Sequence, residues 1–173
     1  MGRRRMVWVI VAGLAVACAA VALGTADNPS VLRPGIEARY PDIAWVDTAS
    51  LARWLQRPPP RRPVLLDTRS RAEFAVSHLA GALRVDPDRP GAAVPHLGEG
   101  VEVVVYCSVG LRSARVVAAL GGRSGRVKNL EGGIFAWANE GRPLYSDDRR
   151  VGTVHEYDAL WGWLLDARRH GRR

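Results

Sequence analysis

The sequence predicts an α/β fold with a central, mostly parallel sheet of about five strands and helices on both faces, preceded by an N-terminal signal or membrane helix. Short apolar runs such as 64–67 and 103–106 alternate with short helical patterns along the chain. These runs lack alternating polar positions, which is typical of parallel strands covered on both faces. An uncharged run at 6–23 precedes them all and predicts the N-terminal helix.

Composition predicts one ordinary globular domain in a chain of 173 residues, of which 47% are hydrophobic and 24% charged. The net charge is +8, but nearly all of the basic residues are arginines scattered through the predicted loops. Only 168–173 gathers several of them. A nucleic-acid-binding protein concentrates its positive charge on one face, so we expect no nucleic-acid partner.

The N-terminal segment 1–26 is predicted to be a signal peptide or a membrane anchor. Arg3, Arg4 and Arg5 precede the run at 6–23, which as a helix would span about 27 Å, and small residues follow at 24–26. The length of this run fits both a signal peptide and a membrane anchor. Lipidation at Cys18 is disfavoured, because Ala15 replaces the large aliphatic residue of a lipobox. The arginines stay in the cytoplasm, so the domain is expected on the extracytoplasmic side, the periplasm in a bacterium.

After this segment, 27–42 contains prolines and little periodicity and is predicted to be a linker. The domain itself is predicted at 43–146. A strand at 43–46 leads to a helix capped by Asp47 or Thr48, and the prolines at 58–60 stop that helix. The second strand, 64–67, ends in a carboxylate, and Ser70 with Glu73 forms a capping box that opens the next helix.

A third strand is predicted at 82–85, a surface connection at 86–100 and a fourth strand at 101–106. Ser113 is expected to cap the following helix, and 127–130 forms the fifth strand. Residues 147–173 are predicted to hold an amphipathic helix, opened by a capping box at 153–156, and a basic tail. Ligands of parallel sheets bind beyond the carboxyl ends of the strands, where Asp67 and Cys107 fall.

The chain has two cysteines, Cys18 in the N-terminal segment and Cys107 in a predicted loop, so it can build no disulfide framework and no zinc-type cysteine pair. The four histidines show no ligand spacing. We therefore expect neither a metal nor another cofactor, and Cys107 is expected to work as a lone thiol.

Cys107 is the candidate nucleophile, because it stands where an apolar strand gives way to a short loop and a helix. Backbone N–H groups and the positive end of a helix dipole at such a place favour the thiolate form, which is the form that attacks. The rest of the loop is predicted to bind the substrate; its residues are Ser108, Val109, Gly110, Leu111, Arg112 and Ser113.

Three blocks of the sequence resemble the single-domain rhodanese family in order and spacing, over about a hundred residues. They are Leu66-Asp67-Thr68-Arg69 with Glu73-Phe74 and His78; Tyr106-Cys107 with Gly110 and Arg112-Ser113; and Gly132-Gly133 with Ala136-Trp137, Gly141 and Pro143. The chain departs from the family pattern at Ser77 and Ala80, where a glycine and a proline are usual.

The resemblance implies a sulfurtransferase, whose loop cysteine takes a sulfane sulfur from thiosulfate or a similar donor as a persulfide and passes it to a thiol or cyanide. Cys107 takes that role here. Four residues separate Cys107 from Arg112, whereas cysteine phosphatases have five. A tight ring of amides suits one sulfur atom better than a tetrahedral oxyanion, which favours sulfur transfer over phosphate hydrolysis.

The charged residues beside the loop have two alternative roles. Arg112 is expected either to turn inward and pair with Asp67 or Glu73, which we favour, or to bind the sulfonate of the donor. Arg69 is the next candidate for a contact with that anion. Asp67 and Glu73 are expected to support the structure, since transfer from a thiolate needs no proton donor there.

The leading interpretation is therefore a membrane-tethered or exported thiosulfate sulfurtransferase, with a small-molecule donor and a thiol acceptor as partners. The alternative is a module without catalytic turnover, which carries a persulfide or docks a partner at the membrane. An arsenate reductase is disfavoured, because it needs a second, resolving thiol that the domain lacks.

Overall fold

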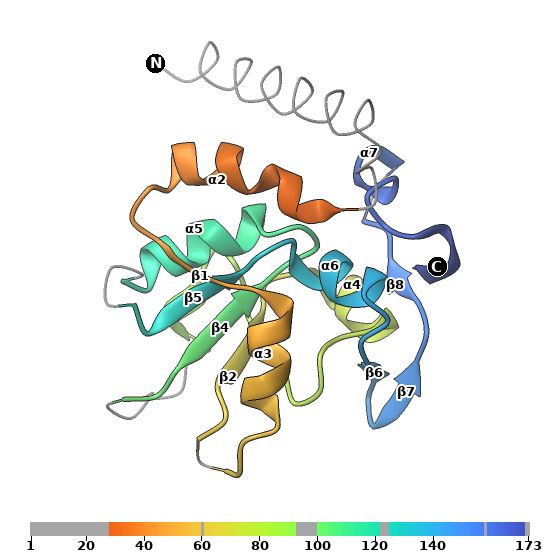
Figure 1. Cartoon of the computed structure of the whole chain (residues 1–173), viewed down its shortest axis with the longest axis horizontal. Helices are drawn as coiled ribbons and strands as arrows, with labels where there is room; N and C mark the ends of the chain where they lie inside the picture. The colour runs from red at the N-terminus through yellow and green to blue at the C-terminus, as the bar shows by residue number, and fades with distance from the viewer. Residues whose placement is uncertain (1–27, 60, 93–99, 122–124, 158, 172–173) are drawn as a thin grey trace.

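The computed structural model describes residues 28–59, 61–92, 100–121, 125–157 and 159–171. Its centre is a five-stranded parallel sheet in the order β1-β5-β4-β2-β3 (Figure 1). The strands are β1 (Ala44–Val46), β2 (Val64–Asp67), β3 (Leu83–Arg84), β4 (Val103–Tyr106) and β5 (Val127–Leu130). The α/β fold with a parallel sheet that the sequence predicts is confirmed.

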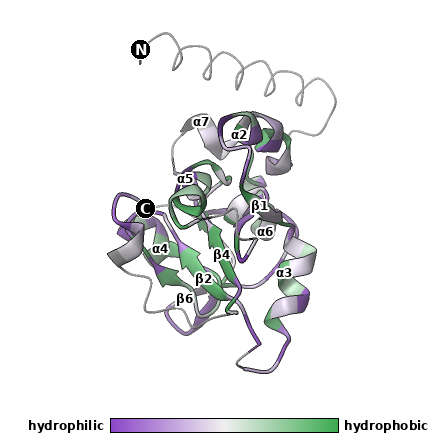
Figure 2. Cartoon of the chain, turned by 90° about the vertical axis from the view of Figure 1, so that its left-hand side faces the viewer, coloured by the Kyte–Doolittle hydropathy of each residue, from purple (hydrophilic) through white to green (hydrophobic). Residues whose placement is uncertain are grey.

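The middle of the sheet is apolar on both faces. All four residues of β4 are buried, and β4 pairs with β2 so that Leu65 lies opposite Val104 and Asp67 lies opposite Tyr106. Figure 2 shows β2 and β4 as hydrophobic segments inside a more polar exterior. The register brings the carboxyl ends of β2 and β4 side by side, and the chain leaves both strands at this edge with polar residues.

The main helices are α3 (Thr48–Leu55), α4 (Arg71–Val76), α5 (Leu111–Ala119) and α6 (Gly133–Asn139). Asp47 caps α3, and both bonds of the predicted capping box between Ser70 and Glu73 are present at the start of α4. The connection through α3 crosses the sheet in one direction and that through α5 in the other. Right-handed crossovers therefore place α3 and α5 on opposite faces (Figure 1).

The segment expected to be a linker folds instead into η1 (Pro29–Leu32) and α2 (Arg33–Arg39). Pro29 and Pro34 lie in the first turns of these helices, where proline fits, because the missing N–H has no helical partner there. Leu32 and Ile36 are buried against the domain, and Arg33 donates to Glu131 over 2.7 Å. Proline content alone therefore misleads here, and η1 and α2 belong to the packed structure.

The C-terminal region also differs from its prediction, since most of the expected long helix is absent from its described residues. A hairpin of β6 (Leu144–Ser146) and β7 (Arg149–Val151) is followed by β8 (Val154–His155), which pairs with β9 (His170–Gly171). Between β8 and β9 lie α7 (Ala159–Gly162) and η4 (Ala167–Arg169), and η2 (Pro90–Ala92) precedes β4. Tyr157 has a positive φ of 68°, which interrupts the helical pattern read from the sequence.

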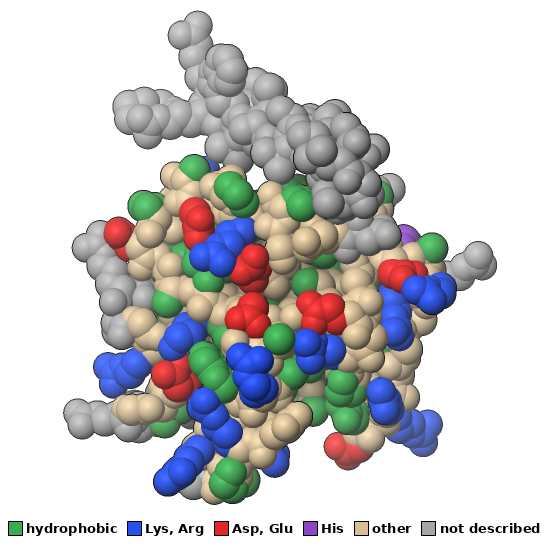
Figure 3. Space-filling view, viewed as in Figure 1, with side chains coloured by type: hydrophobic (Ala, Val, Ile, Leu, Met, Phe, Trp, Pro, Cys, Tyr) green, Lys and Arg blue, Asp and Glu red, His purple; other side chains and the backbone are tan. Residues whose placement is uncertain are grey.

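The predicted signal or anchor segment, 1–26, lies outside the described residues. Within the described ranges, no helix combines the length and apolar character that crossing a membrane requires. On the face shown in Figure 3, Lys and Arg side chains are interspersed with Asp and Glu, with no single basic patch.

Candidate active site

Cys107 follows β4 directly and is buried, with 1% of its surface exposed. Two groups point at its sulfur. The backbone N–H of Gly110 donates to Sγ over 3.2 Å, and the hydroxyl of Ser113 donates to Sγ over 3.5 Å. One amide and one hydroxyl thus hold the sulfur, and both donors favour a negatively charged sulfur over a neutral one.

Ser113 does not cap α5 as the sequence predicts. The helix begins three residues earlier than a Ser113 cap would place it, at Leu111, with Gly110 as the N-cap residue. Ser113 therefore lies inside the first turn, where its hydroxyl reaches Cys107. Val109 is buried and Leu111 half-buried, so these two loop side chains pack into the domain rather than lie open on its surface.

Gly110 has a φ of 99°, a conformation that favours glycine, and this geometry turns its N–H toward the sulfur. Its carbonyl oxygen accepts a 2.8 Å hydrogen bond from Nδ2 of Asn129, a fully buried residue of β5. Asn129 thus fixes the peptide that contacts Cys107. Sequence reasoning missed this residue; the signal was an amide side chain inside an otherwise buried strand, which needs a hydrogen-bond partner.

The start of α6 holds the other side of the loop. The amides of Ile134 and Phe135 donate to the carbonyls of Cys107 and Ser108 over 2.9 and 3.1 Å. Because a trans peptide directs its N–H opposite its carbonyl, the N–H groups that follow these carbonyls point away from α6. This close approach requires Gly133, where a Cβ atom would lie 2.5 Å from the Ser108 carbonyl oxygen and would also strike that of Cys107.

Glu73 and Arg112 form an ion pair beside the loop. Nη2 of Arg112 lies 2.7 Å from Oε1 of Glu73 and 2.9 Å from Oγ of Ser108, while Nη1 donates to Oε2 over 3.1 Å. Burial alone would raise the pKa of Glu73, but the hydrogen bonds and charge of Arg112, with the Ser70 amide, outweigh it and hold that pKa at about 2. Arg112 thus occupies the inward position that we favoured from the sequence.

Asp67 and Arg69 form a second pair, whose side chains are both fully buried. Nη2 of Arg69 lies 2.7 Å from Oδ2 of Asp67 and donates to the carbonyl of Ser77 over 2.5 Å. The placement of Arg69 differs from its expected contact with a substrate anion, because its guanidinium has no surface to offer. The pair instead supports the ends of β2 and the turn after α4.

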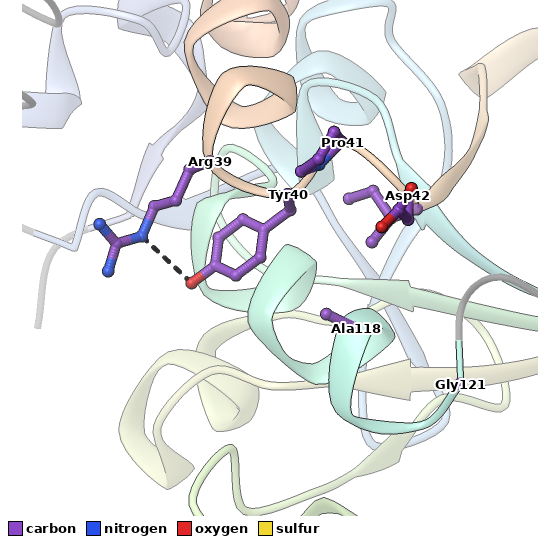
Figure 4. A pocket seen from close by; sticks show the side chains of 7 residues that line it. Arg39, Tyr40, Pro41, Asp42, Ala118 and Gly121 are labelled. Atoms are coloured by element: carbon purple, nitrogen blue, oxygen red, sulfur yellow. Dashed lines mark hydrogen bonds between the residues drawn. The ribbon is translucent and has the colours of Figure 1, made fainter.

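A surface pocket lies elsewhere, at the opposite end of α5 from Cys107 (Figure 4). It is lined by Arg39, Tyr40, Pro41, Asp42, Ile43, Ala118 and Gly121. None of the residues expected at the active site lines this pocket, so the loop around Cys107 remains the candidate site.

Comparison with known proteins points to the same region. The sequence profile of the rhodanese-like domain matches residues 47–140. A sulfurtransferase of Allochromatium vinosum is 35% identical over 86 residues, which cover 49% of this chain and 80% of that protein. Thiosulfate sulfurtransferase 16, chloroplastic, of Arabidopsis thaliana is 33% identical over 92 residues, which cover 45% of this chain and 76% of that protein.

Among solved structures, a rhodanese-like domain protein from Staphylococcus aureus superposes with a TM-score of 0.51 at 26% identity. The match covers 60% of this chain and 97% of that one. The region matched by the family profile includes Cys107, both ion pairs and Gly133, and it ends before Tyr157. The C-terminal elements from β6 onward lie outside the region that the family profile matches.

Proposed function

The chain belongs to the rhodanese-like domain family, and from this premise we propose that it transfers a sulfane sulfur from thiosulfate or a similar donor to a thiol or cyanide, through a persulfide on Cys107. Similarity to sulfurtransferases supports sulfur transfer in general. The observation that carries the finer proposal is the pair of donors, the Gly110 amide and the Ser113 hydroxyl, aimed at the sulfur of Cys107.

The proposed reaction has two displacements. The Cys107 thiolate attacks the outer sulfur of thiosulfate, a new S–S bond forms, and the S–S bond of the donor breaks with release of sulfite, which takes the electron pair. A thiolate or cyanide acceptor then attacks the outer sulfur of the persulfide. The Cys107–sulfur bond breaks, and the Cys107 thiolate is regenerated. The cycle is redox-neutral and needs no further reactant.

The groups around Cys107 support each state of this cycle. The Gly110 amide and Ser113 hydroxyl stabilise negative charge on sulfur, first on the thiolate and again when the persulfide is cleaved. Glu73 and Arg112 hold Ser108 and with it the shape of the loop. Neither residue needs to move a proton, because thiolate, persulfide anion and sulfite all carry their charge without protonation.

A direct test is thiocyanate formation from thiosulfate and cyanide by the purified chain. We expect activity in the wild type and loss of it in Cys107→Ser. Cys18→Ser is the matched control, because it removes the other thiol of the chain and lies outside the family region. Equal activity in wild type and Cys107→Ser would end the catalytic proposal. A persulfide on Cys107 without turnover would instead favour the carrier alternative.

We also propose, from the three arginines ahead of the apolar run at 6–23, that the domain lies on the extracytoplasmic side of a membrane. The test is protease treatment of spheroplasts that express the chain. Digestion of the domain in intact spheroplasts supports the proposal, and protection until lysis contradicts it.

A further inference from the structure

An aromatic ring from the C-terminal region, outside the profile-matched residues, lies against a charged group of the candidate site. The guanidinium carbon of Arg112 is 4.3 Å from the centroid of the Tyr157 ring. Tyr157 is 39% exposed, one of the large apolar or aromatic side chains that the described surface leaves open to solvent. It comes from a part of the chain that the family profile does not cover.

The backbone holds the ring in place at an energetic cost. Tyr157 has a φ of 68°, a conformation that is strained for an aromatic residue and that tends to occur where function maintains it. Its N–H donates to Nδ1 of His155 over 3.0 Å, and His155 is anchored in β8 by pairing with Gly171 of β9. The small sheet of β8 and β9 thus delivers Tyr157 to the site.

Tyr157 contacts Arg112 in addition to the residues that hydrogen-bond to it. Glu73 occupies the edge of the guanidinium through two hydrogen bonds, and Ser108 accepts a third. The guanidinium carbon lies over the Tyr157 ring, as is typical of a cation–π contact. The charge of Arg112 is therefore paired with a carboxylate and contacted by an aromatic ring, while Arg69 is buried with Asp67.

We propose that Tyr157 is a specificity-determining residue, which keeps anionic donors away from the Arg112 guanidinium. With the ring in place, small dianions such as thiosulfate gain little from Arg112, and the site is biased toward less charged persulfide donors. This inference rests on the proposed function, because it assigns a donor class to the same sulfur-transfer site.

The test compares alkylation of Cys107 in the full-length chain by iodoacetate and by iodoacetamide. The two reagents attack the same thiolate and differ in charge, so the ratio of their rates reports the electrostatics of the approach to the sulfur. The Cys107 peptide is quantified by mass spectrometry, which separates it from Cys18. Circular dichroism checks that each variant is folded.

Three substitutions at Tyr157 separate the ring from the backbone. Tyr157→Gly and Tyr157→Asn both tolerate the positive φ and remove the ring, whereas Tyr157→Phe keeps the ring and removes the hydroxyl. Asp147→Gly is the matched control, because Asp147 also has a positive φ, of 49°, but lies in the turn between β6 and β7.

We expect the iodoacetate to iodoacetamide ratio to rise about threefold in Tyr157→Gly and Tyr157→Asn, because an anion then approaches an uncovered guanidinium. The KM for thiosulfate should fall by a similar factor. Tyr157→Phe and Asp147→Gly should match the wild type. An unchanged ratio in the ring-less variants, or an equal rise in Asp147→Gly, overturns the inference. Absence of sulfur transfer in the wild type would defeat the proposed function but would leave the alkylation ratio readable.

Discussion

The pairs Asp67–Arg69 and Glu73–Arg112 lie near the same edge of the sheet, and they differ in their surroundings. Both have a 2.7 Å contact between Nη2 and a carboxylate oxygen. Both side chains of the first pair are fully buried, whereas Arg112 is 28% exposed. Arg69 also donates to the buried carbonyl of Ser77, whereas Arg112 also donates to Ser108, next to the nucleophile.

The surroundings of each ion pair therefore determine its role. A fully buried pair contributes little net stability, but loss of one partner leaves a charge without solvent and is severely destabilising. A half-buried pair beside a loop holds the loop in place, and loss of one partner destabilises the fold less, because water still reaches the remaining charge. The first pair should therefore control folding, and the second should control the geometry around Cys107.

The largest expected effect comes from breaking the core pair. Asp67→Leu leaves the buried Arg69 guanidinium without its partner, and we expect the free energy of unfolding to fall by about 3–5 kcal/mol. Urea denaturation followed by tryptophan fluorescence measures it. In Asp67→Leu/Arg69→Leu the unpaired charge is gone and much of the loss should be recovered. Equal losses in the single and double variants would contradict a burial-driven role.

A smaller loss of stability and a larger loss of activity should follow from Glu73→Gln. Glutamine keeps the capping box with Ser70 but removes the charge that holds Arg112. We expect about 2–3 kcal/mol of lost stability and about tenfold slower sulfur transfer, as the loop around Ser108 loosens. Asp88→Asn is the matched control, since its pair with Arg115 is exposed and should contribute almost nothing. Full activity in Glu73→Gln would show that the ion pair between Glu73 and Arg112 is not needed for sulfur transfer.

Low pH should weaken the ion pair between Glu73 and Arg112 and so lower the stability of the fold. The pKa of Glu73 is lowered from 4.5 to about 2, so its ionised form stabilises the fold above pH 4.5, and this contribution is lost as the pH falls toward 2. We expect about 2 kcal/mol of acid-dependent stability, after allowing for the partial exposure of Arg112. The measurement is the difference in unfolding free energy between wild type and Glu73→Gln from pH 6 to 2. A constant difference across that range contradicts the assignment.

The smallest effect is expected for Arg112→Lys. Lysine keeps the positive charge but lacks the two guanidinium nitrogens that donate to Glu73. An ammonium group cannot reach both oxygens of Glu73 and Ser108 with the same geometry, so stability should fall by about 1 kcal/mol. If Arg112 shapes the loop, kcat should fall while the KM for thiosulfate stays near the wild-type value. A rise in KM at constant kcat would instead assign Arg112 to donor binding.

Short sequence patterns correctly predicted the central strands and the capping box of α4. The apolar runs became the central strands, and Ser70 with Glu73 formed the predicted capping box, because a few neighbouring residues decide each of them. The position of Cys107 at a strand end followed from the same reasoning. The predicted start of α5 at Ser113 was wrong, because Gly110 caps the helix without a side chain.

Contacts between distant parts of the chain were not predictable in this way. Asn129 holds Gly110, and Gly133 admits the loop carbonyls, only because β5 and α6 pack against the loop. The burial of Arg69 likewise depends on the turn at Ser77. The residues around Tyr157 in the sequence do not predict that it leaves the helical pattern and contacts Arg112.

The mass of the Cys107 peptide after treatment with thiosulfate shows whether this cysteine accepts a sulfur atom. If the Gly110 amide and the Ser113 hydroxyl hold a sulfur nucleophile, the peptide should gain about 32 Da, one sulfur atom, and lose it again on addition of cyanide. The Cys18 peptide should stay unchanged. A Cys107 peptide of unaltered mass, in a chain that is folded, would contradict the account.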